Sequence, residues 1–446
     1  MIKINMDKNS KYSRRKFLGN ALRVSSAAIA FPYIIPSSAL GAGLSSSKRP
    51  APSDRIVLAA IGTGRRGRYN LGHFLKQGRV QCVMVCDTMA DRRKMAKDMV
   101  DNFYDNKDCV ATRFQEEVLE RDDIDAVSIA SGDRWHAVHS AQAARAGKDV
   151  YSEKPVTLTI DEGQKLVDTC NAYGTVWQCG TQRRSNQTFK SVVKAVQDGL
   201  IGKVHTITTS FGGPWSTDRV VFAETAPQPD PEEFDYDRWL GQAPWAPYSE
   251  LRVRRWRNNW ATGGGVITDM GPHYLETALW ALNSKMPEHL TFSGEAKFAP
   301  DGFYNVPDEM FVKVQFGDVA IKMDNGKKAV KFEGDMGWIY LDDAYGRVEA
   351  RPRSILQHIE SGFHDMMMAE HLENFLNCMI SRKQPVSNPN IAQKTHMISH
   401  CANLSLRLGR SLTWETSGGR FVGDEEANLM RSRAMRPPWG TAFAGV

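Results

Sequence analysis

The feature that most constrains the fold is a glycine-rich turn between an apolar run and a helical stretch. Residues 56–61 form a continuous apolar run, which is typical of a strand buried on both faces of a parallel sheet. The turn that follows reads Gly62-Thr63-Gly64-Arg65-Arg66-Gly67. An amphipathic stretch then continues through Leu75. A strand, a G-x-G-x-x-G turn and a helix stand in the order that a dinucleotide-binding unit requires.

Strand and helix continue to alternate after this unit. The expected strands lie at residues 80–86, 126–130 and from 149, and the expected helices lie at 91–103 and 136–146. Strands that alternate with helices indicate a doubly wound parallel sheet. The chain is also longer than a typical domain of ~100–200 residues, so we expect a second domain.

The pattern changes after about Ile201. Residues 204–210 alternate between apolar and polar side chains, as a half-buried strand does. Short runs between Gly and Asp turns follow near 310–316, 319–323, 330–333 and 338–341, and helices are expected at 271–283, 364–381 and 392–408. These runs predict an antiparallel sheet with one face covered.

The net charge of +6 lies entirely within residues 1–42. The rest of the chain is neutral, so net charge gives no support for binding to nucleic acid or to an anionic membrane. The seven cysteines lie far apart without a C-x-x-C pair, which argues against a disulfide framework and against a zinc site. We therefore expect buried thiols and no metal.

Residues 1–42 read as an export signal. Arg14 and Arg15 precede a modestly apolar stretch that ends in small residues, a pattern that resembles a twin-arginine signal cleaved near residues 39–42. The alternative is a membrane anchor, but two prolines interrupt a run that is shorter than the ~20 residues needed to span a bilayer. We expect a linker over residues 43–54 and a periplasmic protein carried by the twin-arginine machinery.

Each glycine of the turn has an expected task. Gly62 permits the tight turn, Gly64 lets a pyrophosphate approach the backbone, and Gly67 allows the helix to pack closely on the strand. Asp87 ends the second strand, where its carboxylate would accept hydrogen bonds from ribose hydroxyls and repel a 2′-phosphate. This favours NAD over NADP, although the arginines at positions 92 and 93 keep NADP open.

Two further segments carry residues suited to catalysis. Lys154 follows a strand of the parallel sheet, at the carboxyl edge where such sheets bind ligands, and Pro155 fixes the turn there. Asp269 and His273 are four positions apart at the start of an expected helix, which would place them on one face. An Asp-x-x-x-His pair can also hold a metal, but no third ligand is evident.

With these residues the chain resembles the glucose–fructose oxidoreductase/inositol dehydrogenase (Gfo/Idh/MocA) family. The motifs stand in the family's order: the glycine turn, Trp135-His136, Glu153-Lys154-Pro155, the residues 180–184, the Asp269-x-x-x-His273 helix, and His371 with Asn374-Phe375. Residues 131–133 depart from the family, reading Ser-Gly-Asp where many relatives have Thr-Pro-Asp.

The resemblance implies a domain organisation. Residues 55–180 would form a Rossmann domain that binds the dinucleotide. Residues 181–446 would form an α/β domain with a large, mostly antiparallel open sheet, which supplies the substrate pocket and the contacts of a homodimer or homotetramer. No internal repeat interrupts either part.

The resemblance also implies that Lys154, Asp269 and His273 form the catalytic set. A histidine, with an ordinary pKa near ~6.5, suits the removal of a hydroxyl proton as hydride leaves the carbon. We assign His273 as general base and acid, and Lys154 as the hydrogen-bond partner or relay on the reacting oxygen. Asp269 would be either an orienting acceptor or a ligand of a substrate hydroxyl.

The remaining candidates line the cofactor or the substrate. The expected cofactor contacts are Gly62, Thr63, Gly64, Arg65, Arg66, Gly67, Asp87, Trp135, His136, Glu153 and Lys154. The expected substrate contacts are Arg183, Trp256, Asn259 and Trp260. Indole rings mixed with amide and guanidinium groups suit a sugar, which offers apolar C–H faces and many hydroxyls. The alternative is that the tryptophans pack under the sheet.

The resulting hypothesis is an NAD(P)-dependent oxidoreductase that moves hydride between a tightly held nicotinamide and a hydroxyl of a sugar, glycoside or polyol. An exported enzyme meets no obvious pool of free NAD, which is why we expect the cofactor to be retained. One alternative is an NAD-dependent glycosidase that works by transient oxidation and elimination, although relatives of that kind replace the lysine of Glu-Lys-Pro. A second is a non-catalytic sugar-binding or sensing protein.

Overall fold

The computed structural model describes residues 54–213, 222–299, 301–343, 346–360, 362 and 367–439. The expected export signal and all of the expected linker except its last residue lie outside this part of the chain. None of the described helices is both long enough and apolar enough to cross a membrane.

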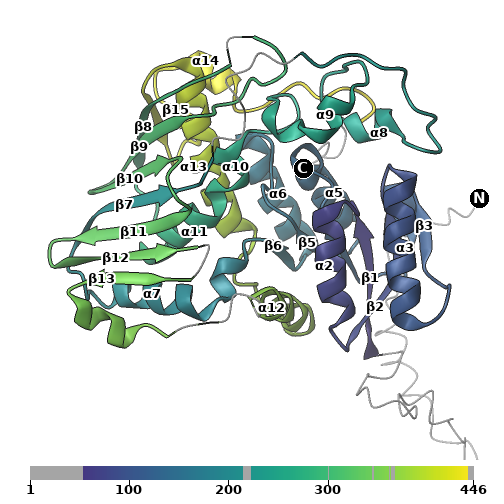
Figure 1. Ribbon diagram of the computed structural model, residues 1–446, viewed down its shortest axis with the longest axis horizontal. Helices are drawn as coiled ribbons and strands as arrows, with labels where there is room; N and C mark the ends of the chain where they lie inside the picture. The colour runs from purple at the N-terminus through teal and green to yellow at the C-terminus, as the bar shows by residue number, and fades with distance from the viewer. Residues whose placement is uncertain are drawn as a thin grey trace, which may run out of the picture. The chain divides into compact units, whose positions relative to one another are not determined.

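A parallel sheet forms the first half of the described chain (Figure 1). Its six strands stand in the order β3-β2-β1-β4-β5-β6 and every neighbouring pair is parallel. The strands are β1 (Ile56–Ile61), β2 (Val80–Cys86), β3 (Val110–Thr112), β4 (Ala126–Ile129), β5 (Asp149–Ser152) and β6 (Trp177–Cys179). This is the Rossmann order, and its switch point lies between β1 and β4, where such sheets bind dinucleotides.

Helices connect these strands. They are α2 (Arg65–Leu75), α3 (Ala90–Tyr104), α4 (Gln115–Glu120), α5 (Asp133–Arg145) and α6 (Ile160–Tyr173). The helix α2 has few apolar residues, but it buries Leu71 and Phe74 fully against the sheet. Burial of one such side chain stabilises a fold by roughly 1.5–3 kcal/mol. The doubly wound parallel sheet expected from the sequence is therefore confirmed.

A nine-stranded sheet forms the second half, in the order β13-β12-β11-β7-β10-β9-β8-β14-β15. All of its pairs are antiparallel except β7 with β10. The strands are β7 (Val204–Ser210), β8 (His289–Ala296), β9 (Met310–Phe316), β10 (Val319–Asp324), β11 (Ala329–Gly334), β12 (Gly337–Asp342), β13 (Val348–Arg351), β14 (Leu412–Glu415) and β15 (Arg420–Phe421). Every second residue of β9 is buried and the others are exposed, so one face is covered, as predicted.

Helices cover that face, and one of them returns to the first sheet (Figure 1). The elements are η2 (Gln182–Ser185), α7 (Gln187–Gln197), α10 (Val266–Asp269), α11 (Gly271–Ala281), η4 (Arg353–His358), α12 (Met367–Ser381), α13 (Pro389–Leu408) and α14 (Glu425–Leu429). Phe375 of α12 packs against Phe74 of α2, with ring centroids 6.4 Å apart. The helix α12 thereby joins the second half of the chain to the nucleotide domain.

A segment without a counterpart in our sequence-based prediction lies between β7 and α10. It contains α8 (Tyr236–Leu240), α9 (Glu250–Arg254) and η3 (Trp256–Asn258). Phe234 of this segment forms a backbone bridge with Met89, at the start of α3. In Figure 1 the segment crosses above the helices of the nucleotide domain.

Candidate active site

The glycine turn joins β1 to α2 with little room for side chains. Gly62 has a φ of 83°, and a Cβ there would lie 2.6 Å from backbone atoms of Ala130 and Ser131. A Cβ on Gly67 would lie 1.9 Å from the carbonyl oxygen of Gly62. At Gly64 a Cβ would meet nothing nearer than a guanidinium nitrogen at 3.6 Å. The fold itself therefore requires the first and last glycines, whereas the middle one leaves space for a ligand near the backbone.

A cavity of about 800 Å³ lies over the start of α2. Among the described residues that line it are six arginines and no carboxylate; the arginines are Arg65, Arg66, Arg92, Arg134, Arg254 and Arg257. No side chain caps the first N–H groups of α2. Free amides at a helix N-terminus together with guanidinium groups suit a pyrophosphate. The residues present therefore fit a dinucleotide.

Asp87 is held in place at the end of β2. Its carboxylate accepts a hydrogen bond from the backbone N–H of Thr63 at 2.7 Å and another from that of Met89 at 3.0 Å. Burial raises the pKa of this carboxyl, against the lowering effect of Arg92. Asp87 and Gly64 line a common small cavity, together with Trp135. This arrangement brings the candidate ribose ligand and the glycine turn to one place.

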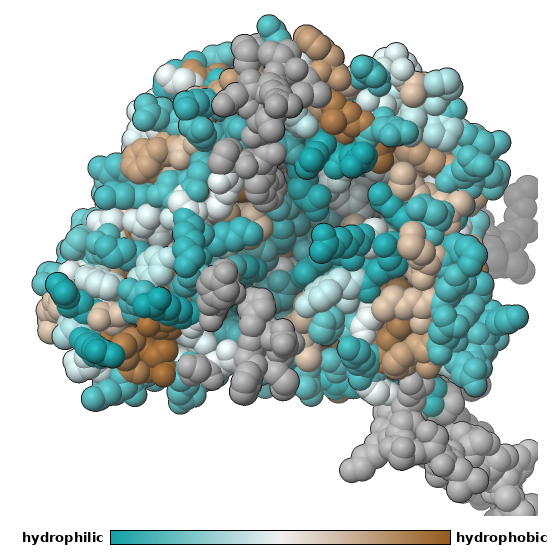
Figure 2. All heavy atoms as spheres, viewed as in Figure 1, coloured by the Kyte–Doolittle hydropathy of each residue, from teal (hydrophilic) through white to brown (hydrophobic). Residues whose placement is uncertain are grey.

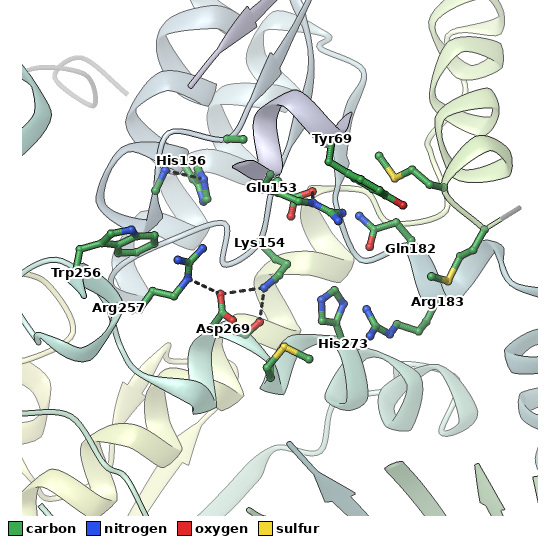
Figure 3. Close-up of a pocket in the computed structure, with 16 residues that line it drawn as sticks. Tyr69, His136, Glu153, Lys154, Gln182, Arg183, Trp256, Arg257, Asp269 and His273 are labelled. Atoms are coloured by element: carbon green, nitrogen blue, oxygen red, sulfur yellow. Dashed lines mark hydrogen bonds and ion pairs between the residues drawn. The ribbon is translucent and has the colours of Figure 1, made fainter. Parts of the chain in front are cut away.

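A second cavity, of about 370 Å³, brings the proposed catalytic residues together (Figure 3). Lys154 lines it from the end of β5, Asp269 from the end of α10 and His273 from α11. His136 and Glu153 line the same cavity from the nucleotide domain. Figure 2 shows a hollow with hydrophilic walls on this face of the molecule.

Lys154 is anchored by Asp269. Its Nζ donates to Oδ1 of Asp269 at 2.9 Å and to the backbone oxygen of Asp269 at 2.8 Å. The Nε of Arg257 donates to the same Oδ1 at 3.1 Å. Burial alone would raise the pKa of the Asp269 carboxyl, but the charges of Lys154 and Arg257 outweigh it and lower this pKa to about 2. Asp269 is therefore ionised at neutral pH, and its carboxylate fixes the position of the Lys154 ammonium group.

His273 is neutral in this setting. It is 5% exposed, and burial lowers its pKa well below the ordinary value, an effect to which the charges of Arg183 and Lys154 add. Its buried Nδ1 has no hydrogen-bond partner among the described residues. A neutral imidazole beside an ammonium group can accept a proton from a hydroxyl that the ammonium polarises.

The sequence predicts one helix for Asp269 and His273, but the structure places them on two. α10 ends at Asp269 and α11 begins at Gly271, so the two residues stand on separate helices. Met270, which lies between the two helices, keeps a right-handed helical backbone, and both side chains still line the catalytic cavity. No described hydrogen bond joins their side chains, and Asp269 orients Lys154 instead. Pro272 lies in the first turn of α11, where a proline is tolerated.

Two other cofactor candidates, His136 and Glu153, are held by hydrogen bonds within the nucleotide domain. The Nδ1 of His136 donates to the carbonyl oxygen of Pro155 at 2.6 Å, and its Nε2 accepts from the N–H of Gly132 at 3.1 Å. Both ring nitrogens thus have a hydrogen-bond partner in the backbone, so His136 fixes the loops at Gly132 and Pro155 and does not act as a base. The buried carboxylate of Glu153 accepts from Arg66 at 2.7 Å and from Asn70 at 3.0 Å.

Two of the four substrate candidates reach the cavity. Trp256 lines it, and so does Arg183, whose Nε and Nη2 bind the two oxygens of Asp343 at 2.9 and 2.5 Å. Tyr274 donates to Asp343 at 2.9 Å and completes this support.

Asn259 and Trp260 are not among the residues that line the cavity, which corrects their assignment. Asn259 donates to the carbonyl oxygen of Phe303 at 2.8 Å, so its amide shapes a loop. The indole of Trp260 lies near two guanidinium groups, at 4.4 Å from Arg407 and 3.8 Å from Arg433. Trp260 is also partly buried against the hydrophobic core of the second domain, so the alternative of a packed tryptophan applies to it.

Sequence reasoning missed several lining residues. Arg257 stands between the candidates Trp256 and Asn259, but its role as a counter-ion of Asp269 depends on the fold of the segment before α10. Tyr69, Met367 and Met368 enter from helices far apart in the sequence. A residue pattern signals none of these three, because only tertiary packing brings them to one cavity.

Two family models match the chain. The model described as the oxidoreductase family, NAD-binding Rossmann fold, matches residues 56–181, and the model described as the oxidoreductase family, C-terminal alpha/beta domain, matches residues 185–441. The chain belongs to the Gfo/Idh/MocA family of oxidoreductases. The family membership, the fold class and the NAD-binding domain expected from the sequence are therefore confirmed.

Relatives of this family differ in what they do. The chain is 24% identical to the uncharacterized oxidoreductase YrbE of Bacillus subtilis over 62% of its own length and 66% of that protein. It is 21% identical to the myo-inositol 2-dehydrogenase of Thermotoga maritima, over 80% of its own length and 98% of the other. A glycosyl hydrolase family 109 protein of Shewanella pealeana is 30% identical, over 34% of each chain.

Solved structures of Gfo/Idh/MocA proteins share the fold. WlbA dehydrogenase from Bordetella pertussis, in complex with NADH and UDP-GlcNAcA, superimposes with a TM-score of 0.58 at 18% identity, over 80% of this chain and 98% of that one. Aldose-aldose oxidoreductase from Caulobacter crescentus gives a TM-score of 0.59 at 18% identity, over 80% and 99%.

Proposed function

We propose that this protein is an NAD(P)-dependent oxidoreductase that transfers hydride between a nicotinamide and a hydroxyl-bearing carbon of a sugar, glycoside or polyol. The observation that carries the proposal is that Lys154 and His273 line one cavity beside the glycine turn. The named relatives include an inositol dehydrogenase and a sugar oxidoreductase, which supports a polyhydroxylated substrate.

The side chains have defined tasks in this reaction. The bound nicotinamide supplies the acceptor or donor of the hydride. Lys154, held by Asp269, donates a hydrogen bond to the reacting oxygen. Neutral His273 takes up the hydroxyl proton during oxidation, and its low pKa makes the imidazolium a strong acid that returns the proton during reduction. Trp256 offers a flat apolar surface for the C–H face of a sugar ring.

The test is a panel of sugars and glycosides offered to the purified protein, with nicotinamide absorbance and product formation followed together. Oxidation of at least one sugar, lost in both Lys154→Ala and His273→Ala, supports the proposal. Binding of sugars without any change in absorbance would contradict it and would favour a non-catalytic sugar-binding protein.

The second candidate function is glycoside cleavage through transient oxidation. The match to the glycosyl hydrolase relatives favours it, whereas the retained lysine at position 154 argues against it. Release of free sugar from an aryl glycoside, with no net change of the nicotinamide, would identify this reaction.

We also propose that residues 1–42 direct the protein through the twin-arginine machinery to the periplasm. The paired arginines and the concentration of net charge before residue 43 support this. N-terminal sequencing of the secreted form tests it, with cleavage expected near residues 39–42. An N-terminus at Met1 on a protein that stays in the cytoplasm would contradict it.

We further propose the domain boundaries 55–180 and 181–446 and a homodimer or homotetramer. The nine-stranded sheet has one covered face and an outer face with exposed side chains, and such a one-faced sheet supports self-association. Light scattering coupled to size-exclusion chromatography tests it, and a monomer at micromolar concentration would contradict it.

A further inference from the structure

The segment between β7 and α10 contributes to every part of the nucleotide groove. We call its residues 230–257 the strap. The strap supplies Arg238 and Trp239 to the small cavity at Asp87. It supplies Trp239, Val253 and Arg254 to the cavity over α2, and Trp256 and Arg257 to the catalytic cavity. One continuous segment of the chain thus follows the groove from the expected adenosine end to the catalytic residues.

The backbone of the strap is joined to the nucleotide domain just beyond Asp87. The backbone N–H of Ala90 donates to the carbonyl oxygen of Glu233 at 2.8 Å, and that of Asp235 donates to the carbonyl oxygen of Thr88 at 3.0 Å. These bonds flank the bridge between Met89 and Phe234. The strap is therefore paired with the loop that directly follows the candidate ribose ligand Asp87.

Side chains reinforce this junction. Arg113, which follows β3, forms an ion pair with Glu232 at 2.7 Å, and Arg238 of the strap forms one with Glu116 at 2.9 Å. The fully buried Arg134 of α5 donates through Nε to the carbonyl oxygen of Trp239 at 2.8 Å. Its guanidinium carbon lies 4.0 Å from the centroid of the Trp239 ring. Removal of the strap would leave this arginine without that partner.

The end of the described chain fastens the strap from outside. We call residues 431–439 the tail. Arg436 of the tail donates from its backbone N–H to Gln242 at 3.0 Å, from Nε to the carbonyl oxygen of Gly241 at 3.1 Å and from Nη1 to Asp237 at 2.6 Å. The Trp439 ring packs edge-on against Trp135 of α5, with centroids 5.6 Å apart. The tail therefore spans the strap and the nucleotide domain.

We propose that the strap and the tail form a latch over the dinucleotide groove, so that the dinucleotide dissociates only when the latch opens and remains bound between catalytic cycles. The inference rests on the proposed binding of a dinucleotide in the groove. It assigns a task to residues remote from the reacting atoms, because neither Arg436 nor Trp439 lines any of the three cavities along the groove.

Retention of this kind has a chemical consequence. A nicotinamide that stays bound must be returned to its starting state on the enzyme. Oxidation of one substrate's alcohol to a carbonyl, with two electrons and one proton passed to the nicotinamide, must be followed by reduction of a second carbonyl compound or of the first product. The latch thus favours a reaction in which the nicotinamide is reduced and reoxidised in the same active site before the dinucleotide leaves.

The test compares Arg436→Ala and Trp439→Ala with the control Arg410→Ala. Arg410 is a matched arginine that also binds carboxylates, Asp424 and Glu426, but on elements away from the groove. The protein is loaded with NADH and mixed with an excess of NAD, and the loss of bound NADH fluorescence gives the dissociation rate. Thermal unfolding of each variant verifies that it is folded.

We expect wild type and Arg410→Ala to keep NADH through dialysis. Both tail variants should release it faster, on the order of tenfold, because interface changes act mainly on dissociation rates. If the tail variants release NADH at the wild-type rate, the latch is refuted. If the wild type itself loses NADH during dialysis, retention is refuted while dinucleotide binding stands. If the chain binds no dinucleotide at all, the proposed function fails as well.

Discussion

Replacing Asp269 by asparagine removes the one carboxylate that holds both Lys154 and Arg257. The Asp269 side chain is 8% exposed, so solvent screens the interaction little. Its pKa is lowered from the ordinary 3.8 to about 2. A difference of this size corresponds to about 2 kcal/mol of stability at neutral pH. We expect Asp269→Asn to lower the free energy of unfolding by at least about this amount, because it also removes the buried carboxylate to which Lys154 and Arg257 both donate.

The sign of the pH dependence follows from the direction of the shift. A carboxyl whose pKa is depressed by folding stabilises the protein above its unfolded pKa, and this stabilisation is lost as the pH falls from 3.8 toward about 2. The difference between wild type and variant should therefore be constant from neutral pH down to about 5 and should shrink by about half near pH 3. Urea unfolding across this range measures it.

A matched control is Asp318→Asn. Asp318 pairs with Lys203 at 2.9 Å, but both side chains are more than two-thirds exposed. We expect this variant to unfold at nearly the wild-type urea concentration. Asp269→Asn should also lower kcat on the order of 100-fold, because the amide that replaces the carboxylate carries no charge to hold the ammonium group of Lys154 in place. Unchanged kcat and unchanged unfolding of Asp269→Asn would refute the anchoring of Lys154.

Three further predictions concern single residues. Arg183→Met should shift the acidic limb of the pH–rate profile of oxidation to higher pH. Loss of this cation raises the pKa of His273, and His273 must be neutral to act as the base. An unshifted limb would argue against His273 as the titrating group. Gly67→Ala should unfold at a lower temperature than wild type, because its Cβ would clash with Gly62. Gly64→Ala should keep the wild-type melting temperature and bind NADH more weakly. Equal melting temperatures of the two variants would contradict this. Trp256→Ala should raise KM for the sugar, whereas Trp260→Ala should lower thermal stability without a change in KM. A raised KM in Trp260→Ala together with an unchanged KM in Trp256→Ala would show that Trp260 contacts the substrate.

The nucleotide domain could be predicted well from the sequence, because steric limits and burial within short segments determine its turn and its strands. The turn from Gly62 to Gly67 works through steric limits that only glycine meets, and these limits are visible in the residue order itself. Apolar runs marked the central parallel strands for the same reason, since a strand buried on both faces tolerates few polar side chains. The sequence also marked Lys154, which directly follows such a strand.

Other parts depended on tertiary structure. The break between α10 and α11 at Met270 is not evident from residue spacing, and neither is the bond from Lys154 to Asp269, because these two residues lie 115 positions apart. The strap contains only short helices, α8, α9 and most of η3, and such short helices show no clear period in the sequence. Its position is set by backbone pairing with residues 88–90, more than 140 positions earlier in the chain.

The most direct test of the proposed chemistry follows the hydride itself. The protein is loaded with NAD and mixed with sugars that carry deuterium on every carbon. The reaction is stopped within the first turnover, before the nicotinamide is reoxidised, and the mass of the recovered dinucleotide is measured by mass spectrometry. We predict that one deuterium appears on the nicotinamide ring with wild type and none with Lys154→Ala. A nicotinamide that gains no deuterium from any sugar that the protein binds would contradict hydride transfer at this site.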